Sequence, residues 1–218
     1  MITDERIRDY LYSLESGQGE LCDRIAREAR RDHIPVIRKE TEALLKTMVA
    51  AKRPGAILEV GTAVGYSALL MAGVMPKDCR ITTIEQYGPR IEAARKHFKE
   101  AAMEDRIALM EGDAGEILKG LEGPYDFIFM DGAKGQYLHW LPMILRLLPE
   151  GGMLFSDNVL QDGDVIESRF AVERRNRTIH SRMREFLYEL KHADCFQTSI
   201  IPLGDGVALS VKKERKEE

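Results

Sequence analysis

The chain has 218 residues, of which 44% are hydrophobic and 31% charged, and its formal net charge is −4 at pH 7. A chain of this length can bury a sizeable core in one domain, and the negative balance argues against nonspecific nucleic-acid binding by the whole molecule. Its apolar runs are far shorter than the roughly 18 to 20 residues of a membrane span. The start of the chain lacks an apolar signal region, and the three cysteines form no Cys-x-x-Cys pair. These features predict a cytoplasmic protein with no membrane partner.

Three helices are expected before residue 54. Apolar residues recur at helical spacing from Ile7 to Leu14. A second helix is predicted over about 20–32, Pro35 breaks it, and a third continues to about residue 51. We interpret this part as a helical cap on a core that spans 54–213, all within one domain.

A glycine-rich turn follows the first predicted strand. The segment Ala56–Ser67 combines an apolar run, a turn with Gly61 and Gly65, and the start of a helix expected over 66–75. Glycine lets the backbone approach a ligand closely, and the first turn of a helix offers free N–H groups. The dinucleotide-binding fingerprint is absent, because Ala63 and Tyr66 stand where it needs glycine.

The next two predicted strands lead into acidic residues. One ends at Glu85, which in a βαβ unit would lie beside the glycine turn and accept hydrogen bonds from ribose hydroxyls. The other, which begins at Arg106, leads to Asp113, where an adenine amino group could be bound. This spacing predicts a nucleoside ligand without a pyrophosphate.

Two apolar runs of strand length deliver oxygen ligands at their carboxyl ends. They end in Asp131 and in Asp157-Asn158, and adjacent strands would bring these side chains to one point. Three oxygen ligands suit a hard cation such as Mg²⁺, and Lys134 would reach whatever the cation holds. The alternative is that these residues only cap helices or form turns.

From residue 56 onward, predicted strands and helices alternate, which indicates a parallel α/β sheet. Further helices are expected near residues 88–103, 114–121, 136–148 and 174–192. The last two strands, at 196–202 and 206–212, are separated by a short turn and should therefore pair antiparallel. Residues 214–218 are predicted to be a frayed tail.

Taken together, five segments resemble the cation-dependent class I O-methyltransferases, a family that includes catechol and caffeoyl-CoA methyltransferases. They are Glu59–Ser67, Glu85, Gly112–Ala114, Asp131–Lys134 and Asp157-Asn158, and the match runs from about Ile34 to the C-terminus. The resemblance implies a Rossmann-like, seven-stranded, mostly parallel sheet with an antiparallel C-terminal strand. It also implies S-adenosylmethionine (SAM) and Mg²⁺ or Mn²⁺ as cofactors, and a homodimer.

The resemblance assigns roles to individual residues. Around SAM it places Val36, Glu59, Gly61, Ser67, Glu85, Asp113, Ala114 and Asp131. It implies Asp131, Asp157 and Asn158 as metal ligands, and Lys134 with Asp131 as the catalytic pair. Lys134 could act as the base if burial and the metal lower its pKa; otherwise it only neutralises Asp131. Ala63 stands where many members carry glycine, which is tolerable if its φ angle stays negative.

The acceptor substrate is less directly encoded. Residues 169–184 contain six arginines and one glutamate, and arginine suits phosphate groups. This pattern resembles bacterial family members that convert 5-hydroxyuridine in tRNA to 5-methoxyuridine. It makes Arg174, Arg175 and Arg177 candidate substrate contacts, and His33 joins them because the resemblance places a lid near Pro35.

Several alternatives stay open. The arginines could form an exposed helical face, the acceptor could be a small catechol or a CoA-linked phenol, and the chain could be a non-catalytic nucleoside-binding protein. The remaining histidines are predicted to lie on helix surfaces, and the two large aromatic residues of the 136–148 helix to pack in the core. The histidines are His97, His139, His180 and His192, and the aromatic residues are Tyr137 and Trp140.

Overall fold

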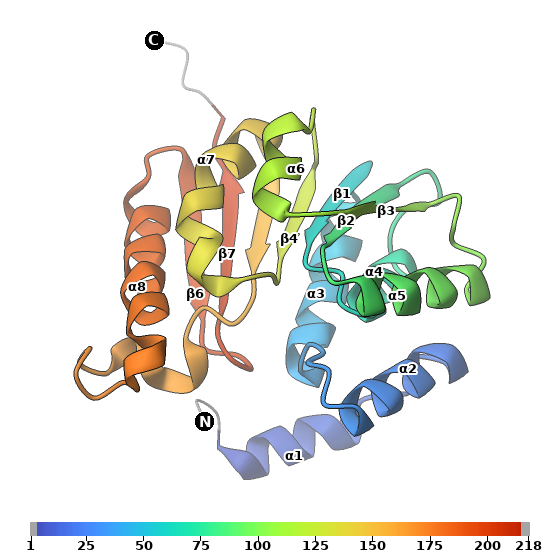
Figure 1. The fold of residues 1–218 in the computed structure, drawn as a ribbon, viewed down its shortest axis with the longest axis horizontal. Coiled ribbons are helices and arrows are strands. Elements are labelled where there is room, and N and C mark those ends of the chain that lie inside the picture. Colours follow the sequence, from blue (N-terminus) through green and yellow to red (C-terminus); the bar gives the residue numbers. More distant parts are fainter. Residues whose placement is uncertain (1–3, 215–218) are drawn as a thin grey trace.

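The computed structural model describes residues 4–214 (Figure 1). Three helices precede the first strand, as the periodicity predicts: α1 (Glu5–Leu14), α2 (Glu20–Arg31) and α3 (Lys39–Lys52). The side chain of Asp4 caps α1 by accepting a hydrogen bond from the backbone of Arg6. Of the predicted tail, residues 215–218 lie outside the described part of the chain.

Seven strands form one sheet within the described residues. They are β1 (Ala56–Val60), β2 (Arg80–Glu85), β3 (Ile107–Glu111), β4 (Phe127–Met130), β5 (Met153–Ser156), β6 (Phe196–Ile201) and β7 (Val207–Lys212). Their order is β3-β2-β1-β4-β5-β7-β6, and β7 runs antiparallel to both of its neighbours. This confirms the predicted mostly parallel sheet with an antiparallel C-terminal strand.

Helices connect the strands and cover both faces of the sheet (Figure 1). They are α4 (Tyr66–Ala72), α5 (Gly88–Glu100), α6 (Ala114–Gly120), α7 (Tyr137–Leu147) and α8 (Arg177–His192). Short 3₁₀ turns named η1 (Lys134–Gln136), η2 (Gln161–Ile166) and η3 (Arg174–Asn176) occur between them. The helices expected from 136 and 174 therefore begin as 3₁₀ turns, and the helix expected over 66–75 ends at Ala72.

Alternate strand residues divide the core into two layers. Ile57 and Phe127 belong to the apolar cluster with α2, α3, α4 and α5, whereas Leu58 and Ile128 belong to the cluster with α6, α7 and α8. This follows from strand geometry, because successive side chains point to opposite faces of a sheet. Both faces are covered, which explains why the parallel strands are almost continuously apolar.

The prediction that four histidines lie on helix surfaces was wrong for two of them. His97 is 7% exposed and its Nδ1 lies 2.8 Å from the backbone oxygen of Val64. His180 is 3% exposed and its Nε2 lies 3.1 Å from the backbone oxygen of Glu167. In both cases a loop covers a helix face that periodicity alone assigns to solvent.

The sheet order determines where a ligand can lie. From β1 the chain adds β2 and β3 on one side, then returns to place β4 and β5 on the other. The connections on the two sides diverge there, so a crevice opens at the carboxyl ends of β1 and β4. No helix within residues 4–214 has both the length and the apolar character needed to cross a membrane.

Candidate active site

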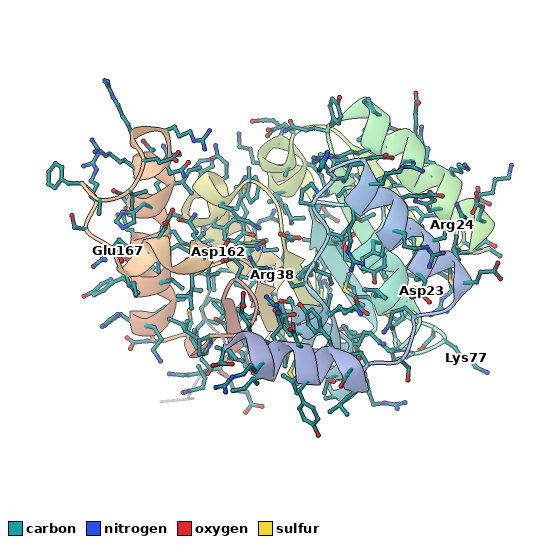
Figure 2. All side chains as sticks on the ribbon, turned by 90° about the horizontal axis from the view of Figure 1, so that it is seen from below. Asp23, Arg24, Arg38, Lys77, Asp162 and Glu167 are labelled. Atoms are coloured by element: carbon teal, nitrogen blue, oxygen red, sulfur yellow. The ribbon has the colours of Figure 1, made fainter. Side chains whose placement is uncertain are left out.

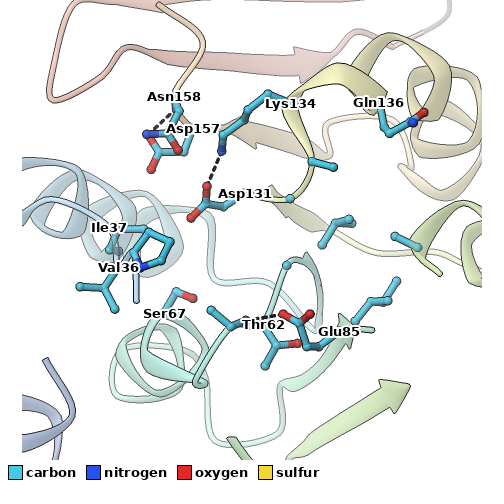
Figure 3. Close-up of a pocket in the computed structure, with 18 of the residues that line it drawn as sticks. Val36, Ile37, Thr62, Ser67, Glu85, Asp131, Lys134, Gln136, Asp157 and Asn158 are labelled. Atoms are coloured by element: carbon cyan, nitrogen blue, oxygen red, sulfur yellow. Dashed lines mark hydrogen bonds and ion pairs between the residues drawn. The ribbon is translucent and has the colours of Figure 1, made fainter. Parts of the chain in front are cut away.

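A cavity of about 890 Å³ lies at the carboxyl ends of β1, β2, β4 and β5. Ten of the predicted site residues line it, and Figure 3 shows several of them: Val36, Gly61, Ser67, Glu85, Asp113, Ala114, Asp131, Lys134, Asp157 and Asn158. Five predicted site residues do not line it, namely His33, Glu59, Arg174, Arg175 and Arg177. The sheet thus brings the predicted cofactor and metal residues together.

Gly61 is the point where the turns after β1 and β4 touch. Its φ angle is +107°, and a Cβ atom added there would lie 2.5 Å from the backbone oxygen of Asp131. No other residue type fits both the backbone conformation and this close approach. The contact holds the glycine turn against the strand end that carries Asp131.

The condition of a negative φ angle, under which alanine would be tolerable at position 63, is not met. The φ angle of Ala63 is +45°, in the left-handed region. The backbone N–H of Ala63 donates to Oε2 of Glu85 at 2.9 Å, and this charge-assisted bond accounts for a conformation that alanine otherwise avoids. The turn is therefore strained at this residue and held by the end of β2.

Ala63→Gly should raise the free energy of unfolding by up to about 1.6 kcal/mol. Glycine removes a left-handed cost of about 1–2 kcal/mol, partly offset by about 0.4–1 kcal/mol from its freer unfolded state. Denaturant midpoints measure the change. Ala93→Gly in α5 is the control and should lower stability by about 0.5–1 kcal/mol. Equal losses in both variants would contradict the left-handed turn.

Glu85 organises the same turn while facing the cavity. Besides the bond from Ala63, its Oε1 accepts from the backbone N–H groups of Gln86 at 2.9 Å and Tyr87 at 3.0 Å. A carboxylate has about four acceptor positions, so Glu85 keeps acceptor capacity for a ligand. Figure 3 shows its carboxylate beside Thr62 at the end of the cavity away from Asp157.

Glu59 supports the site from behind and does not face it. Its side chain is fully buried and accepts hydrogen bonds from the hydroxyls of Ser67 and Thr83, both at 2.5 Å. Burial raises the pKa of Glu59 to about 8, although these two bonds act in the opposite direction. Glu59 therefore positions Ser67, which lines the cavity, whereas Glu59 itself does not line it.

Asp131, Asp157 and Asn158 converge on the other end of the cavity (Figure 3). Asp157 is 2% exposed, and burial raises its pKa to about 7, with a further contribution from the charge of Asp131. Two carboxylates held this close repel each other, and a cation between them would relieve that repulsion. Within residues 4–214 no three His, Cys, Asp or Glu side chains form a metal-binding group, so the candidate set depends on the amide of Asn158.

Asp205 determines how Asn158 presents that amide. Nδ2 of Asn158 lies 3.2 Å from Oδ2 of Asp205. Because a carboxylate only accepts, the NH₂ group faces Asp205 and the amide oxygen is left for the cavity. Asp205 also lines the cavity. Sequence reasoning missed it, because a Gly-Asp-Gly turn between two strands gives no local signal of a distant partner.

Lys134 is tied to the metal residues and to a buried tyrosine. Its Nζ donates to Oδ1 of Asp131 at 2.5 Å and to the hydroxyl of Tyr137 at 3.1 Å. Burial disfavours the ammonium form, but Tyr137, Asp131 and Asp157 together favour it more, so the pKa of Lys134 is raised. The protein groups thus oppose the lowered pKa that a role as base would require.

Tyr137 has a larger role than core packing. It is fully buried against Trp140 and Phe186, as predicted, but its hydroxyl also donates to the backbone oxygen of Met130 at 2.9 Å. The tyrosine thereby links Lys134 to the end of β4. The aromatic spacing on the helix could not reveal this hydrogen bond.

The remaining lining residues close the cavity at its sides. Asp113 caps α6 by accepting from the backbone of Glu116 at 3.0 Å, and Trp140 lies nearby in the lining. On the opposite side, Arg38 pairs with Asp162 at 2.8 Å, and Figure 2 shows these two side chains pointing toward one another. This ion pair joins the segment before α3 to η2, and sequence reasoning missed it.

The arginine segment, residues 169–184, borders the cavity, but its three predicted substrate contacts do not line it. Arg174 and Arg175 are exposed, and Arg175 pairs with Glu173 at 2.7 Å. Arg177 stacks over Phe170 and donates to the backbone oxygen of Val172. Asn176 and Ile179, from the same segment, line the cavity. His33 is exposed and does not line the cavity.

The fold is Rossmann-like, and its cavity has an acidic, oxygen-rich end. A sequence profile described as O-methyltransferase matches residues 19–213. The chain therefore belongs to the O-methyltransferase family and is a SAM-dependent O-methyltransferase, which confirms the predicted family and enzyme class.

Individual relatives agree with this assignment. A catechol O-methyltransferase from Niastella koreensis is 37% identical over 129 residues, which is 57% of each chain. A caffeoyl-CoA O-methyltransferase from Populus kitakamiensis is 27% identical and aligns with 96% of this chain and 94% of its own. The SAH-bound methyltransferase PaMTH1 from Podospora anserina superposes with a TM-score of 0.87 at 26% identity, covering 96% of this chain and 95% of its own.

Proposed function

We propose that this enzyme transfers the methyl group of SAM to a hydroxyl oxygen in an Mg²⁺-dependent reaction, and that the acceptor is 5-hydroxyuridine in tRNA. The observation that carries the proposal is the cavity itself. It joins the acceptors for a nucleoside, Glu85 and Asp113, to the oxygen ligands Asp131, Asp157 and Asn158. One bound donor and one cation-held acceptor could therefore meet within it.

The nucleoside end suits SAM. Glu85 would accept from the ribose hydroxyls, because its carboxylate keeps free acceptor capacity after three backbone bonds. Oδ2 of Asp113 remains for the adenine amino group, since the cap of α6 uses Oδ1. The glycine turn at Gly61 would let the donor approach the backbone closely.

The acidic end suits Mg²⁺ or Mn²⁺. Asp131, Asp157 and the amide oxygen of Asn158 would hold the ion, and Asp205 would keep that oxygen turned toward it. The bound ion would favour the deprotonated acceptor oxygen and orient it toward the methyl group. Asp131 would also keep Lys134 in place through their hydrogen bond.

Lys134 is the candidate group for the acceptor's proton. Its Nζ lies between Asp131 and Tyr137, at the edge of the space where an acceptor oxygen would lie. The surrounding protein charges favour its ammonium form, so a role as base requires the charge of the bound cation to oppose them. In its ammonium form, Lys134 would stabilise the acceptor oxyanion instead.

The position of the arginine segment supports a phosphate-bearing acceptor. Asn176 and Ile179 reach the cavity while Arg174 and Arg175 of the same segment are exposed beside it. A nucleoside in the cavity could therefore have its flanking phosphates near these arginines. The second candidate is a catechol or CoA-linked phenol, because the relatives named above carry those activities. 5-Hydroxyuridine and a catechol each offer two vicinal oxygens.

Replacing Arg174 and Arg175 by alanine should weaken tRNA binding and flatten its salt dependence. Each lost phosphate contact should lower the slope of log K against log salt by about 0.7 to 0.9. The matched control replaces Arg27 and Arg30, two exposed arginines of α2, and should leave the slope unchanged. Filter binding over a salt series measures both, with nucleoside mass spectrometry to identify the methylated product.

The reverse pattern would contradict the tRNA proposal. Loss of catechol turnover in the Arg174 and Arg175 variant, with tRNA affinity and salt slope intact, would assign the segment to a small-molecule site. Equal slope changes in both variants would mean that the effect comes from the protein's net charge and not from contacts of Arg174 and Arg175. A wild-type enzyme that binds SAM but methylates none of these acceptors would favour a non-catalytic nucleoside-binding protein.

The homodimer and the division into a helical cap and a core remain predictions. α1 has no buried residue and exposes Ile7, Tyr10 and Leu14. A second copy of the chain that covered this apolar side would remove it from water. Sedimentation equilibrium of wild type and of Tyr10→Glu would test the dimer, because a charge in such an interface should favour the monomer.

A further inference from the structure

A second pocket lies on the other side of α8 from the active-site cavity. Its volume is about 380 Å³, and its lining residues are Glu167, Ser168, Arg169, His180, Ser181 and Arg184. Ile179 lines the first cavity and the adjacent His180 lines the second. The first turns of α8 therefore separate the two sites, and Figure 2 shows Glu167 beside that helix.

His180 is the unusual member of this pocket. It is 3% exposed, and its Nε2 must carry a hydrogen because it faces a backbone oxygen, that of Glu167, at 3.1 Å. Its Nδ1 is buried without any hydrogen-bond partner in the described part of the chain. A buried polar atom without a partner costs free energy, so this nitrogen is poised for a ligand that the pocket would hold.

The other groups in the pocket are mostly donors. Arg169 is exposed and makes no hydrogen bond or ion pair within residues 4–214. Arg184 uses Nη1 to bond the backbone oxygen of Val165 at 2.9 Å, which leaves Nη2 free. The hydroxyl of Ser168 accepts from the backbone of Phe170, so its own hydrogen is available. The acidic side chain in the lining is Glu167, so the pocket keeps a positive balance.

We propose that this pocket binds a phosphate group of the acceptor substrate. Arg169 and Arg184 would each donate to phosphate oxygens, Ser168 would add a neutral donor, and His180 in its protonated form would donate from Nδ1 while keeping its bond to Glu167. The proposal rests on the proposed function, because it requires an acceptor that carries phosphate: the backbone of tRNA or the phosphates of a CoA thioester.

Phosphate in this pocket would also stabilise the rim of the active site. Asp164 lines the first cavity, and the next residue, Val165, accepts the bond from Arg184. Arg182, which belongs to α8 but does not line the pocket, donates to the backbone oxygen of Gly135, next to Lys134, at 2.9 Å. A phosphate held against α8 would thus keep the substrate beside the segment at Asp164 and the segment at Lys134.

Titration of the full-length protein with inorganic phosphate, followed by ¹⁵N NMR of its histidine rings, tests the proposal. The Nδ1 signal of His180 should move in a saturable way, from the position of a lone-pair nitrogen toward that of a protonated one. Arg169→Ala should weaken phosphate binding by about tenfold or more, since one charge-assisted bond is lost, and Arg169→Lys should restore part of it. Arg27→Ala, which removes the same charge from α2, should not change it.

Competition identifies the source of the phosphate. Displacement of inorganic phosphate by an RNA lacking hydroxyuridine would assign the pocket to a backbone diester, and displacement by CoA would assign it to a thioester substrate. Either result supports the phosphate site. A His180 signal that phosphate moves no more than chloride does, or equal weakening in Arg169→Ala and Arg27→Ala, would overturn it.

The two proposals can fail separately. An enzyme that methylates hydroxyuridine while its His180 ignores phosphate would retain the proposed function and lose this site. If phosphate binds at His180, CoA displaces it and tRNA stays unmethylated, this site would be retained and the tRNA substrate would be lost.

Discussion

Asp157→Ala should lower kcat/KM for methyl transfer by about 10²- to 10⁴-fold while the protein stays folded. The proposed ion supplies several kcal/mol of charge stabilisation in the transition state, and each 1.36 kcal/mol corresponds to a factor of ten. The loss of activity follows from removing one of the three proposed ligands. The protein should stay folded, because burial already disfavours the charged form of this side chain. Radioactive methyl transfer measures activity, and circular dichroism checks the fold.

Chelation should have the same effect without a mutation. EDTA should abolish turnover of the wild type, and Mg²⁺ or Mn²⁺ should restore it. Adding Mg²⁺ or Mn²⁺ to Asp157→Ala should not restore its activity. Asp105→Ala is the matched control, because Asp105 is exposed in the loop before β3. Full activity of the metal-stripped wild type would exclude the metal role of Asp131, Asp157 and Asn158.

Glu85→Ala should weaken SAM binding by about 10- to 150-fold. An unpaired buried partner or a lost charged hydrogen bond costs about 1.5 to 3 kcal/mol, and Glu85 would lose its bonds to the ribose. The structure adds a second cause, because the same carboxylate holds the backbone N–H of Ala63 in a left-handed turn. Isothermal titration calorimetry measures the affinity.

Two controls separate these causes from general damage. Glu111 is the register partner of Glu85 on β3, but it does not line the cavity and its carboxylate pairs with Arg95, so Glu111→Ala should bind SAM like the wild type. Asp157→Ala should also bind it nearly normally, since it lies at the other end of the cavity. Unchanged affinity in Glu85→Ala would mean that the cofactor does not contact the end of β2.

Much of this protein can be predicted from local sequence alone. Alternating strands and helices predict the α/β sheet, because each apolar run is too short for a helix and is bounded by turn residues. The acids at the ends of β2, β4 and β5 are predicted to share one edge of the sheet, because parallel strands end on the same side. This prediction needs only chain order and strand length, and the structure places Glu85, Asp131 and Asp157 in the lining of one cavity.

The family resemblance was equally accessible, since it depends on short motifs at fixed places in the chain. It identified the O-methyltransferase family and the seven-stranded sheet. It places Glu59 near the cofactor, and the fold buries this side chain behind Ser67. A motif records that a residue is needed and does not record which way its side chain points.

Contacts between distant segments were decided only by the tertiary structure. The left-handed turn at Ala63 depends on a carboxylate 22 residues later, and the orientation of Asn158 depends on Asp205, 47 residues later. The charge state of Lys134 follows from Asp131, Asp157 and Tyr137 around it, and the unpaired nitrogen of His180 from the loop that covers α8. Local sequence determined which backbone elements form and where their ends lie, because those depend on neighbouring residues. Hydrogen-bond partners, burial and pKa depend on which segments meet in space, and only the folded chain brings those segments together.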